Sequence, residues 1–425
     1  MQSGKLDEAE ALIRRALASA PGNADAHNLL GIVLDKRGRA AEAEREYLEA
    51  LRLNPRAVST RVNLGVLLAR AGRSDEAVQS FEAVLREAPD HPQAMFNLGL
   101  QYAARGDYGR AVFFFERLNA QRPRAFEVLF NLGTTLYHLK RFAEAEAALS
   151  SAASLAPAAP GPFYYLGLVA SAREQSEEAV AFWQKALSLR ADFADANFMI
   201  GEELRKRLRY EGAAEFYELA LKQDPTKLVY YARLGGVDML LVRFKQALEI
   251  FQRAAERFPD VAETHYFVGL AARGGANYDV AEAAFRKSLA LQPANADALA
   301  QLGYLQGERG NYAEAEQLLR RAIALGAEHF YAHYDLGRLL VKTRRYDDAL
   351  PLLLRGAELC ASHAGVHYQL FMAFSRLKRK DEAERESALF KAMEEQRKQR
   401  RDGADPCQTN APGGLQGVAL PTPSN

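Results

Sequence analysis

The chain has 425 residues, and its 55 lysine and arginine residues balance its 54 aspartate and glutamate residues. This balance argues against a general polyanion-binding surface, so nucleic acid is not an expected partner. The longest apolar runs, such as residues 112–115, fall far short of the roughly 20 residues of a membrane-spanning helix, so no membrane insertion is expected.

The first predicted element is a single helix, residues 6–20, within a half unit that spans residues 1–21. Leu6, Ile13 and Leu17 lie on a face that a preceding helix would normally cover. We therefore expect self-association through this end, fraying, or cover by residues upstream of Met1. No apolar signal segment precedes the helix, which favours a cytoplasmic location. An upstream start would instead favour export or a periplasmic location.

Residues 22–395 repeat one 34-residue pattern eleven times. Ten units carry a glycine at the same place, here called the repeat glycine: Gly31, Gly65, Gly99, Gly133, Gly167, Gly201, Gly235, Gly269, Gly303 and Gly337. The last unit has Phe371 there. Twelve residues after each of these eleven positions stands an alanine: Ala43, Ala77, Ala111, Ala145, Ala179, Ala213, Ala247, Ala281, Ala315, Ala349 and Ala383. With only 30 glycines in the chain, this register predicts one array of two-helix units.

Each unit is predicted to contain a first helix with the repeat glycine and a second helix with the alanine, which gives 23 helices with the half unit. Glycines seven residues after the repeat glycine, such as Gly38 and Gly310, mark the turn between them, and prolines such as Pro55 end many second helices. The last helix becomes strongly charged, as a terminal cap should. Residues 402–425 are rich in Gly, Pro, Ala and Thr and are predicted to be disordered.

This pattern resembles the tetratricopeptide repeat, whose motif has Leu-Gly in the first helix, Ala and an aromatic residue in the second, and Pro at the end. The resemblance implies an all-α solenoid, a right-handed superhelix with first helices inside and second helices outside. The early tryptophan of the family motif is absent. Asp238 replaces a usual Tyr or Leu, and Phe371 replaces a glycine, so repeat seven and the last repeat are expected to pack irregularly.

No constellation of residues typical of catalysis is found, so the chain is not expected to be an enzyme or to need a cofactor. Two histidine pairs at helical spacing, His329 with His333 and His363 with His367, could in principle face a metal ion. No third ligand is evident, and the 34-residue period explains both pairs as one surface copied twice. Metal binding is therefore not expected.

The candidate binding residues begin with Asn63, Asn97 and Asn131, each two residues before a repeat glycine. Asparagine is a mediocre helix former, but its amide offers a donor and an acceptor to a peptide backbone. This asparagine ladder resembles the repeat region of the O-linked N-acetylglucosamine transferases, and that resemblance implies extended polypeptides held in the inner groove. Nothing of that enzyme's catalytic part is present.

Neighbouring aromatic residues, namely Phe96, Phe130 and Tyr164, are expected to add apolar subpockets to such a groove. The densest basic segment supplies Arg205, Lys206 and Arg233, which fall on the inner face in the resembled family and would suit an acidic partner segment.

The predicted function is that of a scaffold or adaptor that binds other proteins, as extended peptide segments, in a concave groove. Two alternatives stay open. One is a non-catalytic subunit that targets an enzyme such as a glycosyltransferase, and the other is an export or envelope-assembly factor.

Overall fold

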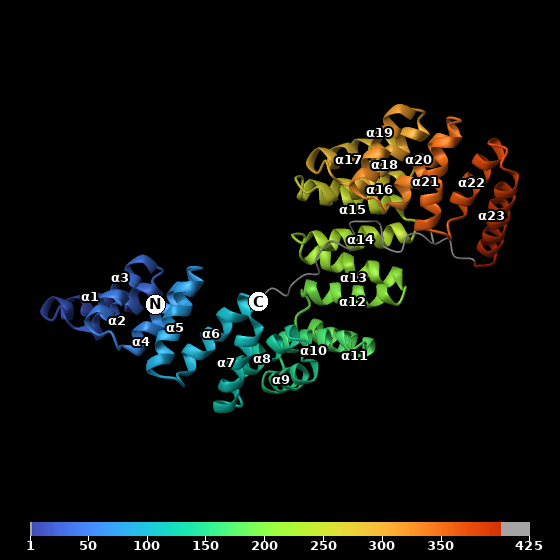
Figure 1. The fold of residues 1–425 in the computed structure, drawn as a ribbon. Helices are drawn as coiled ribbons and strands as arrows, with labels where there is room; N and C mark the ends of the chain where they lie inside the picture. Colours follow the sequence, from blue (N-terminus) through green and yellow to red (C-terminus); the bar gives the residue numbers. More distant parts are fainter. Residues whose placement is uncertain (1, 401–425) are drawn as a thin grey trace. The chain divides into compact units, whose positions relative to one another are not determined.

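The computed structural model describes residues 2–400, and these residues form 23 helices and no strands (Figure 1). The all-α class and the number of helices are as predicted. Contacts divide the chain into two compact units, residues 1–191 and residues 192–425, and each unit is a solenoid of helical hairpins. The predicted disordered tail, 402–425, lies outside the described residues.

The helices of the first unit are α1 (Gln2–Ser19), α2 (Ala24–Lys36), α3 (Ala40–Leu53), α4 (Val58–Arg70), α5 (Ser74–Glu87), α6 (Pro92–Ala104), α7 (Tyr108–Gln121), α8 (Phe126–His138), α9 (Phe142–Leu155), α10 (Pro160–Ala172) and α11 (Ser176–Leu189). Those of the second unit are α12 (Ala194–Lys206), α13 (Tyr210–Gln223), α14 (Leu228–Leu240), α15 (Phe244–Arg257), α16 (Ala262–Gly274), α17 (Tyr278–Leu291), α18 (Ala296–Glu308), α19 (Tyr312–Leu325), α20 (Phe330–Lys342), α21 (Tyr346–Leu359), α22 (Ala364–Arg376) and α23 (Lys380–Arg400). From α2 on, even-numbered helices are the first helices and odd-numbered helices the second helices of the repeats.

The repeat glycines exist because a large side chain packs against each of them. A Cβ added at Gly99 would stand 2.8 Å from the Phe115 ring, and similar overlaps arise at the other nine repeat glycines. The side chains that cover the ten glycines come from the second helix, sixteen residues on: Tyr47, Phe81, Phe115, Leu149, Trp183, Tyr217, Phe251, Phe285, Leu319 and Leu353. All ten are fully buried, so each hairpin interlocks a ring or a leucine with bare backbone.

The turn between first and second helix has the same backbone in every repeat. One residue there takes a left-handed conformation, with φ from +74° to +85° where it is Gly38, Gly72, Gly106 or Gly310. Seven other repeats place a side chain in that conformation, with φ from +57° to +62°, at Lys140, Glu174, Leu208, Val242, Ala276, Arg344 and Lys378. The turn geometry is therefore a property of the repeat, since it persists where glycine is absent.

The two repeats expected to be irregular behave differently from each other. Repeat seven is regular: Phe251 covers Gly235 as in its neighbours, and Asp238 is simply buried, with Arg243 3.8 Å away. In the last repeat the large and the small residue exchange helices. Phe371 stands on the first helix at the place of the repeat glycine, and Ser387 stands on the second helix at the place of the large side chain. A hollow of about 470 Å³ lies between α22 and α23, lined in part by these two residues.

Candidate functional site

The three predicted asparagines lie on the first helices α4, α6 and α8 of the first unit, and each is half-buried. The amide nitrogen of Asn97 donates to the Gln93 carbonyl at 2.8 Å, and that of Asn131 donates to the Glu127 carbonyl at 2.7 Å. Asn63 donates across the repeats, to the side chain of Asn28 on α2 at 3.1 Å. One N–H of each amide is thus used within the fold, and the ladder offers a ligand the acceptor oxygens of Asn97 and Asn131.

The predicted aromatic residues separate into two groups. Phe96 and Phe130 are half-buried, and Phe130 stacks on Phe126 with 5.9 Å between ring centroids. Tyr164 is only 1% exposed and its backbone carbonyl accepts a hydrogen bond of 3.1 Å from the Trp183 indole. Phe96 and Phe130 therefore retain surface for a ligand, whereas the ring of Tyr164 belongs to the core.

The predicted basic residues of the second unit face buried carboxylates of α12, two of them from α12 itself and Arg233 from α14. Glu202 is buried and accepts hydrogen bonds from Arg233 at 3.0 Å, from Arg205 at 3.1 Å and from the Tyr217 hydroxyl. Burial acts to raise the pKa of Glu202, but hydrogen bonds and the charges of both arginines outweigh it and lower the pKa. The positive charges of Arg205 and Arg233 are therefore partly neutralised within the protein.

The same pairing occurs one residue further along α12. Lys206 Nζ lies 3.1 Å from the buried carboxylate of Glu203. The three predicted basic residues and their two glutamates therefore sum to one positive charge, from three cations and two anions. An acidic ligand would meet a weaker field than the sequence suggested.

A cavity that the sequence analysis did not identify opens among the first helices α18, α20 and α22 of the second unit. It measures about 320 Å³, and Tyr304, Glu308, Asp335, Arg338, Lys342 and Gln369 are among the residues that line it. The Tyr304 ring contacts two guanidinium groups, with Arg338 4.9 Å and Arg273 5.5 Å from its centroid. The cavity thus combines a flat aromatic surface with both signs of charge.

Asp335 is a buried acidic residue of this cavity. Its carboxylate is buried and lies 3.5 Å from Arg338, and burial raises the pKa of Asp335 to about 6. Both Asp335 and Gln369 occupy the place two residues before the repeat position, which is also the place of the asparagines. Extending the ladder by steps of 34 residues would have found them, because they are polar residues in the same phase.

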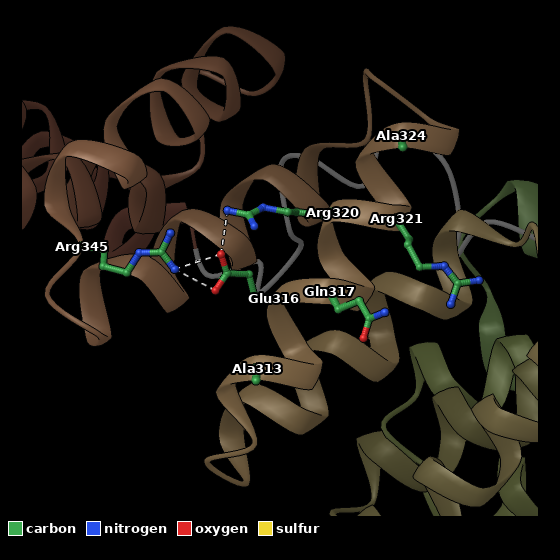
Figure 2. A pocket seen from close by; sticks show the side chains of 7 residues that line it. All are labelled: Ala313, Glu316, Gln317, Arg320, Arg321, Ala324 and Arg345. Carbon is green, nitrogen blue, oxygen red and sulfur yellow. Dashed lines mark hydrogen bonds and ion pairs between the residues drawn. The ribbon is translucent and has the colours of Figure 1, made fainter.

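A third hollow lies on the second-helix surface of α19 (Figure 2). Glu316 sits between Arg345, at 2.8 Å, and Arg320, at 2.6 Å, while Arg321 points away from them. This hollow of about 610 Å³ is built from one helix and one turn, and its charges are largely paired. It is a weaker candidate for a ligand than the cavity between three helices.

No group of three or more His, Cys, Asp or Glu residues in the described part of the chain is placed to hold a metal ion. Within residues 2–400, no helix is both long and apolar enough to cross a membrane.

The fold and its regular first-helix surfaces define an α-solenoid built from helical hairpins. The tetratricopeptide repeat model matches residues 1–58, 243–296 and 300–364, and the model of the cilia and flagella-associated protein 70 C-terminal domain matches residues 54–229. The chain is a tetratricopeptide repeat protein, as its motifs predicted. Such proteins generally mediate protein–protein interactions and are typically non-catalytic.

Solved structures give matches of the same kind. MamA from Desulfovibrio magneticus is 25% identical over 40% of this chain and 95% of its own, with a TM-score of 0.38. YrrB, described as a repeat protein with an unusual peptide-binding site, is 26% identical over 44% of this chain and 96% of its own, with a TM-score of 0.40. A repeat protein from Parabacteroides merdae is 15% identical over 58% and 98%, with a TM-score of 0.49. A comparison with curated proteins gave no match.

Proposed function

We propose that the chain is a protein-interaction module whose first helices bind extended peptide segments of partner proteins. The observation that carries this proposal is the pair of acceptor oxygens on Asn97 and Asn131. In the described part of the chain, neither Oδ1 atom takes part in a hydrogen bond, and both side chains are partly exposed one repeat apart. A polar residue in the helix interior with an open acceptor suits a ligand N–H donor.

The spacing of the repeats supports a peptide backbone as the ligand. Packed helices lie roughly 8–10 Å apart, and three residues of extended chain cover about 10 Å. Successive asparagines can therefore accept from about every third backbone N–H. Phe96 and Phe130, each one residue earlier, would add apolar contacts, so binding would be broad in sequence.

The cavity around Tyr304 is a second candidate surface, in the other compact unit. A polar or acidic side chain of a ligand could pack on the Tyr304 ring and receive hydrogen bonds from Arg338 and Lys342. Asp335 would oppose an acidic group when it is ionised, so such binding should strengthen as pH falls below the raised pKa of Asp335, about 6.

The test is a selection of random-sequence peptides on the full chain, followed by titration of the enriched peptides. The Asn97→Ala, Asn131→Ala variant should bind the peptides that occupy the first unit about thirtyfold more weakly, since each of the two lost hydrogen bonds contributes about 1 kcal/mol. Gln79→Ala is the matched control, because Gln79 is an exposed amide on the second helix α5. Equal losses in both variants would contradict the proposal.

The cavity is tested with the same peptides. Arg338→Gln should weaken those bound by the second unit, whereas Arg321→Gln, in the hollow on α19 of Figure 2, should leave them bound. If peptides respond only to Arg321→Gln, the binding surface lies on the second helices.

A further inference from the structure

Two neighbouring repeats of the second unit carry apolar side chains on the tips of their turns. Leu208, between α12 and α13, and Val242, between α14 and α15, are each 70% exposed. Both take the left-handed backbone conformation, with φ of +57° and +60°. Leu240, 57% exposed, stands beside the second tip.

The stability of the fold does not explain why Leu208 and Val242 occupy these turns. A left-handed conformation is unfavourable for residues with a Cβ, and most of all for a β-branched residue such as Val242. Glycine takes the same conformation without that penalty at Gly38, Gly72, Gly106 and Gly310. Since Leu208 and Val242 bury little surface within the chain, the structure loses stability at both places and gains no packing in return.

The two tips stand on the same edge of the second unit. The first helices α12 and α14 lie side by side, because Arg233 on α14 donates to Glu202 on α12 at 3.0 Å and Tyr230 on α14 donates to Asp195 on α12 at 2.6 Å. Equivalent turns of adjacent repeats therefore follow each other along one edge.

Basic side chains surround these apolar tips. Arg207 and Arg209 flank Leu208, and Arg243 and Lys245 follow Val242, all of them exposed. In residues 2–400, no carboxylate lies within 4 Å of Arg207, Arg209 or Lys245, and Arg243 has only the 3.8 Å contact with Asp238. These cations differ from Arg205 and Arg233, which share the carboxylate of Glu202.

We propose that this turn edge, made of Leu208, Leu240 and Val242 with Arg207, Arg209, Arg243 and Lys245, binds the surface of an anionic lipid bilayer. Apolar tips would enter the boundary between headgroups and acyl chains while the cations meet lipid phosphate and carboxylate groups. A plane can reach both tips at once. A peptide would need a groove around it, and tips that are 70% exposed do not form one. This binding would be peripheral and goes beyond peptide recognition on the first helices.

The test is co-sedimentation of the full chain with phosphatidylcholine vesicles that contain about a third phosphatidylserine, compared with pure phosphatidylcholine. We expect binding to the anionic vesicles only, and its loss as salt rises from about 0.1 M to about 1 M, where the screening length falls to about 3 Å. The Arg207→Gln, Arg209→Gln, Arg243→Gln variant should reduce the partition coefficient at least about tenfold.

The sharper variant is Leu208→Gly, Val242→Gly, because glycine suits both turns. This variant should melt at the same or a higher temperature than the wild type. Its binding to the anionic vesicles should nevertheless be about tenfold weaker. Lys140→Gly is the matched control, a left-handed turn residue of the first unit whose replacement should not change vesicle binding. Failure of the wild-type chain to bind anionic vesicles, or undiminished binding by the double glycine variant, would overturn the proposal; an acidic protein partner would then be the better explanation for the edge.

Discussion

The ring of Phe251 packs against the bare backbone of Gly235, so closely that a Cβ at Gly235 would come 2.5 Å from the ring. Phe251 itself is 0% exposed. Glycine inside a helix costs roughly 1 kcal/mol relative to alanine, and here the close approach of α14 and α15 offsets this cost. The same relation, repeated in ten hairpins, ties the sequence period to the packing of the fold.

The first prediction concerns this contact. Gly235→Ala should lower the free energy of unfolding by about 1–3 kcal/mol, because the overlap with a fully buried ring outweighs the better helix propensity of alanine. Gly109→Ala is the control: Gly109 is exposed on α7, and an added Cβ there has only the Asp107 carboxylate 4.0 Å away. That change should be neutral or stabilising by up to about 1 kcal/mol. Urea unfolding of both variants checks the pair, and a Gly235→Ala variant as stable as Gly109→Ala would contradict the packing.

A second prediction concerns the reversed pair of the last repeat. Phe371→Gly alone should destabilise α22 and α23, because it removes a ring without filling the adjoining hollow of about 470 Å³. Phe371→Gly with Ser387→Phe restores the arrangement of seven other repeats, in which a ring on the second helix covers a glycine on the first helix. The double variant should be more stable than the sum of the single changes by about 1–2 kcal/mol. A double-mutant cycle from thermal melts measures this coupling, and strict additivity would show that the two sites do not interact.

The period of 34 residues was enough to predict the helices, because the repeat glycine and alanine each mark a place of close helix contact. It could not predict the division at residue 191, since the register of Gly167 and Gly201 runs across that point unchanged. Nor could it show that α12 neutralises its own basic residues. Glu202 and Glu203 precede Arg205 and Lys206 by three residues, a spacing that permits pairing, but burial of both carboxylates depends on the neighbouring helices.

The asparagine ladder shows the same limit at atomic scale. Its place on the first helices followed from the period, whereas the hydrogen bonds from Asn97 and Asn131 to their own helices depend on side-chain rotamers that no sequence pattern fixes. Burial of Tyr164 likewise depends on the rings packed around it. The cavity around Tyr304 needs three helices to come together, so no local motif marks it in the sequence.

The third prediction tests the buried carboxylate of α12. Glu202→Gln should cost about 3 kcal/mol at neutral pH, since it leaves Arg205 and Arg233 with a neutral partner in a desolvated place. The lowered pKa of Glu202 means that its contribution is present above the pKa of the unfolded chain and is lost as pH falls through the pKa of the folded chain.

The wild type should therefore lose stability in acid more steeply than Glu202→Gln, in thermal melts followed by circular dichroism. Glu215→Gln, an exposed change on α13, is the control and should follow the wild type. Parallel acid profiles of the wild type and Glu202→Gln would show that the ion pairs do not stabilise the fold.

The last prediction compares two histidines at the same place in different repeats. His27 contacts the Pro21 carbonyl through Nε2 at 3.0 Å and the Glu46 carboxylate through Nδ1 at 2.7 Å. Both partners only accept, so both ring nitrogens must donate, which requires the charged imidazolium. Burial acts to lower the pKa of His27, but the hydrogen bond and the charge of Glu46 outweigh it and raise the pKa.

His333 makes the equivalent contact with the Ala327 carbonyl, at 3.0 Å, but its buried Nδ1 has no partner among the described residues. Burial lowers the pKa of His333. The stability that each histidine contributes therefore changes with pH in opposite directions at His27 and His333. His27 contributes stability below the pKa of the unfolded chain and loses it as pH rises through its folded pKa, whereas neutral His333 contributes above its unfolded pKa and loses this as pH falls.

We therefore expect His27→Gln to lower the melting temperature more at about pH 5 than at about pH 8, and His333→Gln to do the reverse. For each variant, the loss in free energy of unfolding at the two pH values should differ by about 1 kcal/mol. This is the scale of one hydrogen bond or of a pKa shift of about one unit. Each variant serves as the control for the other, because both keep a polar side chain at the same place in the repeat. Profiles that move in the same direction with pH would show that Glu46 does not set the charge of His27.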